Sequence, residues 1–240
     1  MTEKNLKREC ATAAFAYVPA EGVIGLGGGT TIHYLIDLIA KSHRPALQVV
    51  TPSAATRSYC KQSGLNLGAL EDISRIDRAF DGCDQVDTHF NALKSGGAIH
   101  TKEKLIAAMA DDYMLLVDES KYTDTLTFAL PVAIEVLPPA FSYVSRRLAE
   151  FGATAVVPRT SAAKDGITVS DGGNLIVDAF FPESADVRAL NRSFFCTPGI
   201  VDTSLFVDVV SAVLVTGESG SRLVRKSSEK IDKDESLDDG

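Results

Sequence analysis

Apolar residues in the first half of the chain alternate between helical spacing and short runs typical of buried strands. We expect helices over residues 3–18 and 30–41, from about 53 to a stop at Gly64, and over 102–111 with Thr101 as N-cap. Strands are expected at residues 22–27, 47–50, 78–80 and 113–117. Strands that alternate with helices in this way predict a parallel sheet covered on both faces.

The pattern changes after about residue 130. We expect strands at 131–136 and 155–157, a helix at 139–151, a hairpin pairing 167–169 with 175–177, and a short helix within 182–192. This grouping predicts a small α+β domain on an antiparallel sheet. Residues 205–216 return to buried-strand character and can rejoin the first sheet, which would make the small domain an insertion. Charged residues and serines dominate 226–240, which predicts a disordered tail.

Composition and charge exclude several classes of function. The 240 residues carry 24 Lys and Arg against 32 Asp and Glu, a net charge of −8 that argues against nucleic-acid or membrane-surface partners. Four scattered cysteines without a C-x-x-C pair indicate neither a disulfide framework nor a zinc site. The charged first ten residues lack the apolar core of a signal peptide, and no apolar run approaches a membrane span. We therefore expect a cytoplasmic protein.

A glycine-rich loop, Gly25-Leu-Gly-Gly-Gly-Thr-Thr31, lies between an expected strand and an expected helix. Backbone N–H groups at a helix N-terminus form an anion site, and Thr30 and Thr31 add hydroxyl donors. Thr30 stands where a dinucleotide fingerprint requires glycine, and no G-K-[ST] follows, so the loop matches neither nucleotide motif. The alternative is a tight turn that binds nothing.

Candidate chemistry follows farther along the chain. Asp81, Asp84 and Asp87 lie beyond the end of a strand, where open α/β sheets bind ligands. Such carboxylates can take protons from sugar hydroxyls or bind a metal, or they can form a solvated loop. Lys94 precedes a flexible Gly-Gly pair, and Glu103 falls in the first turn of a helix, where an acid also complements the helix dipole. The histidines show no i, i+4 pairing for a metal.

These short motifs occur in a fixed order along the chain. They are Gly25–Thr31, Asp81-Gly-Cys-Asp84, Lys94-Ser-Gly-Gly97, Thr101-Lys-Glu-Lys104 and Asp118-Glu-Ser-Lys121, with further matches at Leu130-Pro-Val-Ala-Ile-Glu-Val136 and Asp171-Gly-Gly-Asn174. Together they resemble the type A ribose-5-phosphate isomerase family over residues 3–220. The resemblance implies an α/β fold, with a Rossmann-like domain (1–129 and 202–225) and a smaller inserted α+β, ferredoxin-like domain (130–201). It also implies a homo-oligomer, a dimer or a tetramer.

The family interconverts ribose 5-phosphate and ribulose 5-phosphate without a metal or cofactor. The resemblance implies that Lys94 stabilises the enediolate oxyanion and that Glu103 carries the proton between C2 and C1. Asp81 and Asp84 would contact the sugar hydroxyls and assist ring opening. The phosphate would be held by Gly28, Gly29, Thr30, Thr31, Lys121 and Lys7. Gly82, Cys83, Ser95, Gly96 and Gly97 complete the expected substrate-binding set.

Two features put conditions on this assignment. A helix N-terminus lowers the pKa of a carboxylate, so a general base at Glu103 needs burial or nearby acids to raise it. Gly28, Cys83, Gln85 and Ser95 depart from the usual family residues Thr, Ala, Glu and Gly. These departures leave open a silent or altered-specificity sugar-phosphate-binding paralogue. A sugar-phosphate deaminase or an acyl-CoA transferase shares the broad fold but not the motifs.

Overall fold

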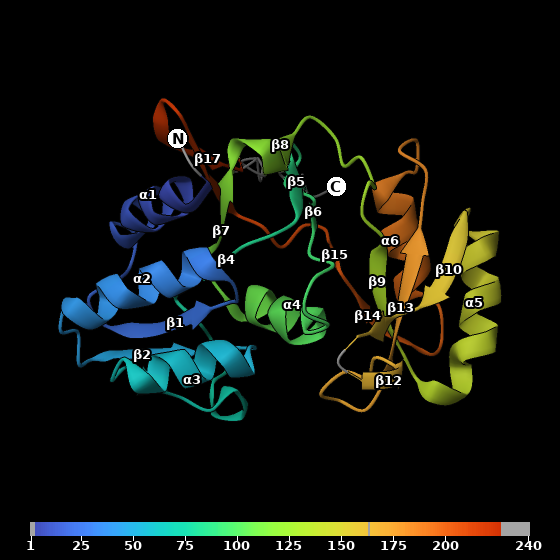
Figure 1. Cartoon of the computed structure of the whole chain (residues 1–240), viewed down its shortest axis with the longest axis horizontal. Helices are drawn as coiled ribbons and strands as arrows, with labels where there is room; N and C mark the ends of the chain where they lie inside the picture. Colours follow the sequence, from blue (N-terminus) through green and yellow to red (C-terminus); the bar gives the residue numbers. More distant parts are fainter. Residues whose placement is uncertain (1–2, 163, 227–240) are drawn as a thin grey trace, which may run out of the picture.

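A seven-stranded sheet combines strands from the first half of the chain with two strands after residue 211 in the computed structural model, which describes residues 3–162 and 164–226 (Figure 1). Its order is β17-β16-β7-β4-β1-β2-β3, and all neighbours are parallel except β16 and β17. The strands are β1 (Gly22–Leu26), β2 (Leu47–Val50), β3 (Asn66–Leu67), β4 (Arg78–Asp81), β7 (Tyr113–Asp118), β16 (Ala212–Gly217) and β17 (Gly220–Arg225). The predicted parallel sheet is confirmed.

Helices cover both faces of this sheet, as the alternation predicted. On one face lie α1 (Glu3–Phe15), α2 (Thr30–Lys41) and α3 (Ala54–Gln62), which share a core with β1, β2, β4, β7 and β16. The other face packs against α4 (His100–Met109) through Ile106 and Ala107. The buried face of α2 consists of apolar residues at helical spacing, Ile32, Leu35, Ile36 and Ile39.

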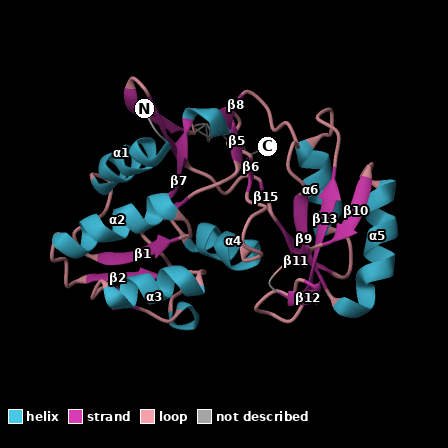
Figure 2. Ribbon diagram, viewed as in Figure 1, coloured by secondary structure: helices cyan, strands magenta, loops and turns pink. Residues whose placement is uncertain are grey.

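A four-stranded antiparallel sheet, the second sheet, forms most of the remaining structure (Figure 2). Its order is β10-β13-β9-β14, and α5 (Phe141–Glu150) and α6 (Val187–Phe195) contribute to its core. Its strands are β9 (Val132–Val136), β10 (Ala155–Pro158), β13 (Leu175–Phe180) and β14 (Ile200–Thr203). The α/β class with a separate antiparallel sheet is therefore confirmed. The domain boundaries at 130 and 201 stay predictions, and β14 continues the second sheet to Thr203.

A small third sheet, which the apolar pattern did not predict, lies between the other two (Figure 1). It has the order β15-β6-β5-β8. Its strands are β5 (Gln85–Asp87), β6 (Ala92–Leu93), β8 (Tyr122–Thr123) and β15 (Leu205–Phe206). Strands of two or three residues are too short to show a periodic pattern. The buried run predicted over 205–216 is accordingly divided between β15 and β16.

Several local predictions were wrong. The helix that carries Glu103 begins at His100 with Ile99 at the N-cap, so Thr101 lies inside it. The expected hairpin is confirmed only next to its turn, where Val169 bridges Leu175 and the N–H of Ile176 donates to the carbonyl oxygen of Thr168 at 3.0 Å. Farther along, β13 pairs with β9 and β10, whereas β12 (Lys164–Ile167) pairs with β11 (Thr160–Ser161). The helix predicted within 182–192 starts at Val187 because Asp186 caps it by accepting the N–H of Ala189 at 2.9 Å.

The remaining elements are three short 3-10 turns, η1 (Leu70–Asp72), η2 (Glu119–Lys121) and η3 (Pro138–Ala140). Within the described parts of the chain, no helix combines the length and apolar character that crossing a membrane requires. The tail predicted to be disordered lies outside the described residues, except for Lys226.

Gly25 on β1 determines how closely α4 approaches the sheet. A Cβ atom at this position would lie 2.6 Å from Ile106 Cγ2 and 2.8 Å from the Cβ of Ala79 on β4. Both distances are far below van der Waals contact, so only glycine allows α4 to pack here. This packing brings the first turn of α4, and with it Glu103, over the carboxyl end of the sheet.

We predict that Gly25→Ala lowers the free energy of unfolding by about 1–3 kcal/mol, because overpacking a core forces neighbouring atoms to shift. Urea denaturation monitored by circular dichroism measures this change. Gly28→Ala is the matched control, since a Cβ there meets only Ser53 Oγ, at 4.0 Å. Equal stability of the two variants would contradict the tight packing of α4 on β1.

Candidate active site

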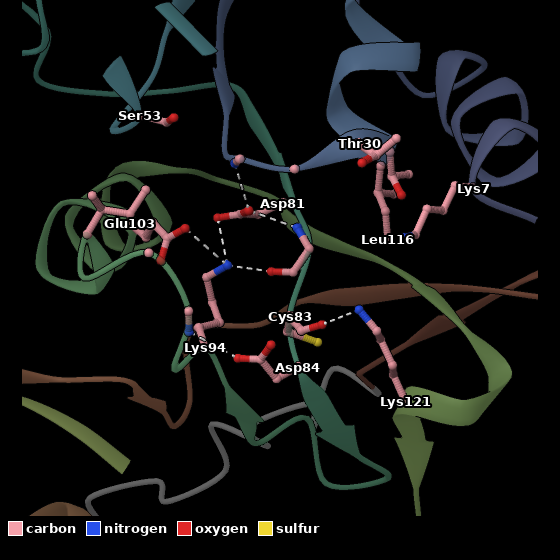
Figure 3. Close-up of a pocket in the computed structure, with 17 residues that line it drawn as sticks. Lys7, Thr30, Ser53, Asp81, Cys83, Asp84, Lys94, Glu103, Leu116 and Lys121 are labelled. Atoms are coloured by element: carbon pink, nitrogen blue, oxygen red, sulfur yellow. Dashed lines mark hydrogen bonds and ion pairs between the residues drawn. The ribbon is translucent and has the colours of Figure 1, made fainter. Parts of the chain in front are cut away.

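A cavity of about 460 Å³ opens at the carboxyl ends of the parallel strands (Figure 3). Loops after β1, β2, β4 and β7 line it, together with α1, α4 and the loop after β6. The predicted residues that line it are Lys7, Gly28, Gly29, Thr30, Thr31, Asp81, Gly82, Cys83, Asp84, Lys94, Gly96, Gly97, Glu103 and Lys121. Folding therefore gathers nearly all of the predicted set around one cavity.

Three buried charged side chains meet at the floor of this cavity. Lys94 Nζ lies 3.0 Å from Asp81 Oδ2 and 3.4 Å from Glu103 Oε1, and it donates a hydrogen bond to the carbonyl oxygen of Gly82 (Figure 3). The exposed fractions of Asp81, Lys94 and Glu103 are 3%, 6% and 6%. Buried charges are costly unless they are paired, so each of these groups depends on the others.

The backbone N–H groups of two glycines orient the Asp81 carboxylate. Its Oδ1 accepts the N–H of Gly82 at 2.8 Å and that of Gly28 at 3.3 Å. A Cβ on Gly27 would lie 1.9 Å from the same oxygen, so the residue directly after β1 must be glycine where Asp81 approaches it. The buried Tyr113 hydroxyl donates to Oδ2 at 3.2 Å. Asp81 is thus held on both oxygens.

The surroundings of Glu103 raise its pKa, as a general base at the start of a helix requires. Burial raises the pKa of Glu103 to about 7, with Asp81 adding to the shift and Lys94 opposing it. Burial also disfavours the charged form of Lys94, but Asp81 and Glu103 outweigh this effect and raise the pKa of its ammonium. At neutral pH, Lys94 is therefore a cation, and Glu103 can both accept and release a proton.

Asp84 positions the loop that carries Lys94. Its Oδ2 accepts the N–H of Ser95 at 2.6 Å and the N–H of Gly96 at 3.3 Å. Ser95, predicted to bind substrate, does not line the cavity, because its hydroxyl instead donates to the carbonyl oxygen of Pro131. Its own carbonyl oxygen accepts from Arg159 at 2.7 Å, so Ser95 connects the loop to the region of the second sheet.

The opposite end of the cavity is suited to an anion. Helix α2 begins at Thr30 after Gly29, whose φ of 95° favours glycine, and no side chain caps its first turn. Lys121 lies across the cavity from this helix start and donates to the carbonyl oxygen of Cys83 at 3.0 Å, and Lys7 also lines this end. Unpaired helix N–H groups beside two cations form an anion site.

Cys83 lines the cavity as a buried thiol, whereas the candidate Asp87 lies outside it. Burial raises the pKa of the Cys83 thiol to about 12, and Lys94 and Lys121 oppose the shift more than the neighbouring carboxylates contribute to it. Asp87 lies outside the cavity, because its carboxylate accepts from the backbone of His89 and from Asn91 in a tight turn. Within the described residues, no group of three or more His, Cys, Asp or Glu side chains could hold a metal ion.

Three residues that line the cavity were not predicted from the sequence: Ser53, Ile99 and Leu116. Ser53 follows β2 and caps α3 by accepting the N–H of Thr56 at 3.2 Å. Its position at the carboxyl end of a parallel strand was a usable signal. Ile99 and Leu116 are apolar, and no sequence pattern separates them from ordinary core residues.

The chain is similar to known ribose 5-phosphate isomerases over most of its length. The family model for ribose 5-phosphate isomerase A (phosphoriboisomerase A) matches residues 48–220. The ribose-5-phosphate isomerase A of Pyrococcus furiosus is 36% identical over 230 residues, covering 94% of this chain and 100% of the relative. That of a Synechococcus strain is 36% identical over 225 residues, covering 91% and 96%.

Solved structures are similar over the same length. Ribose 5-phosphate isomerase A from Methanocaldococcus jannaschii matches with a TM-score of 0.86 and 32% identity, covering 94% of this chain and 100% of that one. A D-ribose-5-phosphate isomerase in complex with phospho-erythronic acid matches with a TM-score of 0.88, 30% identity and the same coverage. The chain therefore belongs to the ribose 5-phosphate isomerase A family.

Proposed function

We propose that this chain interconverts D-ribose 5-phosphate and D-ribulose 5-phosphate through an enediolate, a step of the non-oxidative pentose phosphate pathway. The observation that carries the proposal is the ammonium of Lys94 between Asp81 and Glu103, facing a cavity with an anion site at its other end. Moving a proton between adjacent carbons needs one carboxylate that reaches both and a cation where charge develops on oxygen. Membership of the family supports the same reaction.

Each part of the cavity has a role in the proposed reaction. The first turn of α2, with Lys121 and Lys7, holds the phosphate, which orients the sugar chain toward Glu103. Asp81 and Asp84 contact the sugar hydroxyls and assist opening of the ring. Glu103 then removes the C2 proton while Lys94 stabilises the negative charge on the enediolate oxygen. The proton of the C2 hydroxyl passes to O1, and return of the carbon-bound proton from Glu103 to C1 then gives the ketose and restores the carboxylate.

The family and the sequence also support inferences about the location of the protein and its assembly. We infer a cytoplasmic location from the scattered cysteines, which indicate no disulfide framework and fit a reducing compartment. We infer that the chain forms a homodimer or a larger homo-oligomer such as a tetramer, as the family resemblance implies. Size-exclusion chromatography with light scattering measures the assembly.

An isomerase assay with purified protein tests the proposed function. Ribose 5-phosphate is supplied in the presence of EDTA, and ribulose 5-phosphate is measured directly by nuclear magnetic resonance. We expect turnover at a rate that EDTA does not change. Folded protein that binds ribose 5-phosphate without turnover would contradict the proposal and favour a silent binding protein.

We predict that Glu103→Gln retains ligand binding but loses about 10²–10⁴-fold in kcat, because an amide cannot accept the C2 proton. Binding of phospho-erythronic acid, a phosphorylated acid without an aldehyde to isomerise, is measured by calorimetry alongside the kinetics. A variant with more than about half the wild-type kcat would exclude Glu103 as the base.

We expect the rate to fall as the pH drops through about 7, because protonated Glu103 cannot act as a base. The measurement is kcat/KM between pH 5.5 and 8.5. The substrate phosphate, with a second pKa of about 6, adds its own ionisation. The fall in kcat/KM near pH 7 should therefore be absent from the pH profile of the residual activity of Glu103→Gln. The same fall in both proteins would assign it to another group.

We predict opposite kinetic effects for two lysines. Lys94→Ala should lower kcat more than it raises KM, because the ammonium meets charge that develops only near the transition state. Lys121→Ala should mainly raise KM, because phosphate binding is present in ground and transition states alike. Lys61→Ala, at an exposed position in the last turn of α3, controls for the change in net charge. The reverse partition in both variants would overturn these roles.

A further inference from the structure

The first turn of α4 is held in place by side chains outside the helix. Its N-cap residue, Ile99, makes no side-chain hydrogen bond to the turn. Instead, the residues around Glu103 bind acidic partners from the other half of the molecule. Thr101 contacts Glu135 on β9, Lys102 contacts Asp171, and Lys104 contacts Asp202 on β14. The proposed base thus lies on a helix that the second sheet holds.

The partner of Thr101 is the most enclosed of these acids. Glu135 is 4% exposed and lies on β9, between β13 and β14. It accepts hydrogen bonds from the Thr101 hydroxyl, from Ser170 Oγ at 2.6 Å and from Asn174 Nδ2 at 2.8 Å. Burial disfavours its charge, but these three donors outweigh that effect and hold the pKa of Glu135 below its usual range. The result is a buried, ionised and hydrogen-bonded anchor.

The three links differ in what they can fix. Lys102 and Asp171 pair at 2.7 Å, but their side chains are 47% and 57% exposed, and exposed pairs contribute little. Lys104 is largely buried and reaches Asp202 at 2.5 Å and the carbonyl oxygen of Thr203 at 2.6 Å. That contact holds the turn after Glu103. The contact between Thr101 and Glu135 is the buried side-chain link on the N-terminal side of Glu103.

Helix geometry connects this link to the cavity. With 3.6 residues per turn, side chains two positions apart point to roughly opposite sides of a helix. Thr101 therefore contacts the second sheet while Glu103 extends toward Lys94 (Figure 3). A rotation of α4 that broke the Thr101 contact would also turn the Glu103 carboxylate away from Lys94.

We propose that Glu135 is a positioning residue for the isomerisation, and that its hydrogen bond with Thr101 fixes the rotation of α4 and the placement of the Glu103 carboxylate. This inference rests on the proposed function of Glu103. The phosphate end of the cavity is built from α1, α2 and Lys121, whereas the side-chain hydrogen bonds of Glu135 go to Thr101, Ser170 and Asn174. Loss of the link should therefore impair proton transfer and leave ligand binding intact.

The matched pair Thr101→Val and Thr101→Ser tests the link with little change in packing. Valine keeps the branched shape without the hydroxyl, whereas serine keeps the hydroxyl. We expect kcat to fall at least about tenfold in Thr101→Val, since small misplacements of a catalytic group are costly, and to stay within about twofold of wild type in Thr101→Ser. KM and the Kd for phospho-erythronic acid should change by less than about twofold in both.

Two further variants test the acidic partner. Glu135→Leu, which can make no side-chain hydrogen bond to Thr101, should reproduce the loss of kcat seen in Thr101→Val, and the double variant should lose little more than either single one, because each removes the same contact. Asp171→Asn removes the exposed link to α4 and should leave kcat unchanged. Equal kcat in Thr101→Val and Thr101→Ser would overturn the proposal, as would a rise in KM and Kd that accounts for the whole effect.

Hydrogen exchange of the α4 amides tests whether Glu135 anchors α4 independently of whether the protein is an isomerase. We expect faster exchange at Glu103 to Ile106 in Thr101→Val than in Thr101→Ser, with β16 unchanged in both. If the wild-type protein showed no turnover, the proposed function would fail, and exchange alone would decide whether Glu135 anchors α4. Equal exchange in the two variants would reject the anchor.

Discussion

The ammonium of Lys94 is the charge on which the rest of the site depends. It lies within 3.4 Å of two carboxylates in a place from which water is largely excluded. Without it, Asp81 and Glu103 would be two buried acids with no counter-charge, a costly arrangement. Its presence keeps Asp81 paired and leaves Glu103 with a pKa of about 7, raised chiefly by burial. Charge stabilisation and proton transfer in the proposed reaction both require this balance.

The fold supplies this balance from two sheets. The parallel sheet carries Asp81 at the end of β4 and the anion site at the start of α2. Lys94 lies on the loop that contains Ser95, and Glu103 lies on the helix that contains Thr101. Ser95 and Thr101 tie this loop and this helix to the region of the second sheet. The separation of Lys94 and Glu103 therefore depends on how the two sheets are joined. Buried polar contacts, which need defined partners, are suited to hold such a junction.

Sequence patterns predicted the parts of the molecule that follow local rules. Periodic apolar residues identified α2 and the long strands, and ordered motifs identified the residues that line the cavity. The pattern gave no sign of the contact between Thr101 and Glu135, because it joins residues 34 positions apart, and Thr101 was assigned to a helix cap instead. The side-chain direction of Ser95 and the burial of Cys83 likewise depend on packing between distant segments.

Isomerisation in heavy water tests proton transfer by Glu103, because a carboxylate that carries a proton can exchange it with solvent before returning it. Ribose 5-phosphate is incubated with the protein and EDTA in deuterium oxide, and the ribulose 5-phosphate formed is examined by nuclear magnetic resonance. We expect product with deuterium at C1, formed at a rate independent of EDTA. Ribulose 5-phosphate with no solvent deuterium at C1, or no ribulose 5-phosphate from folded protein, would contradict it.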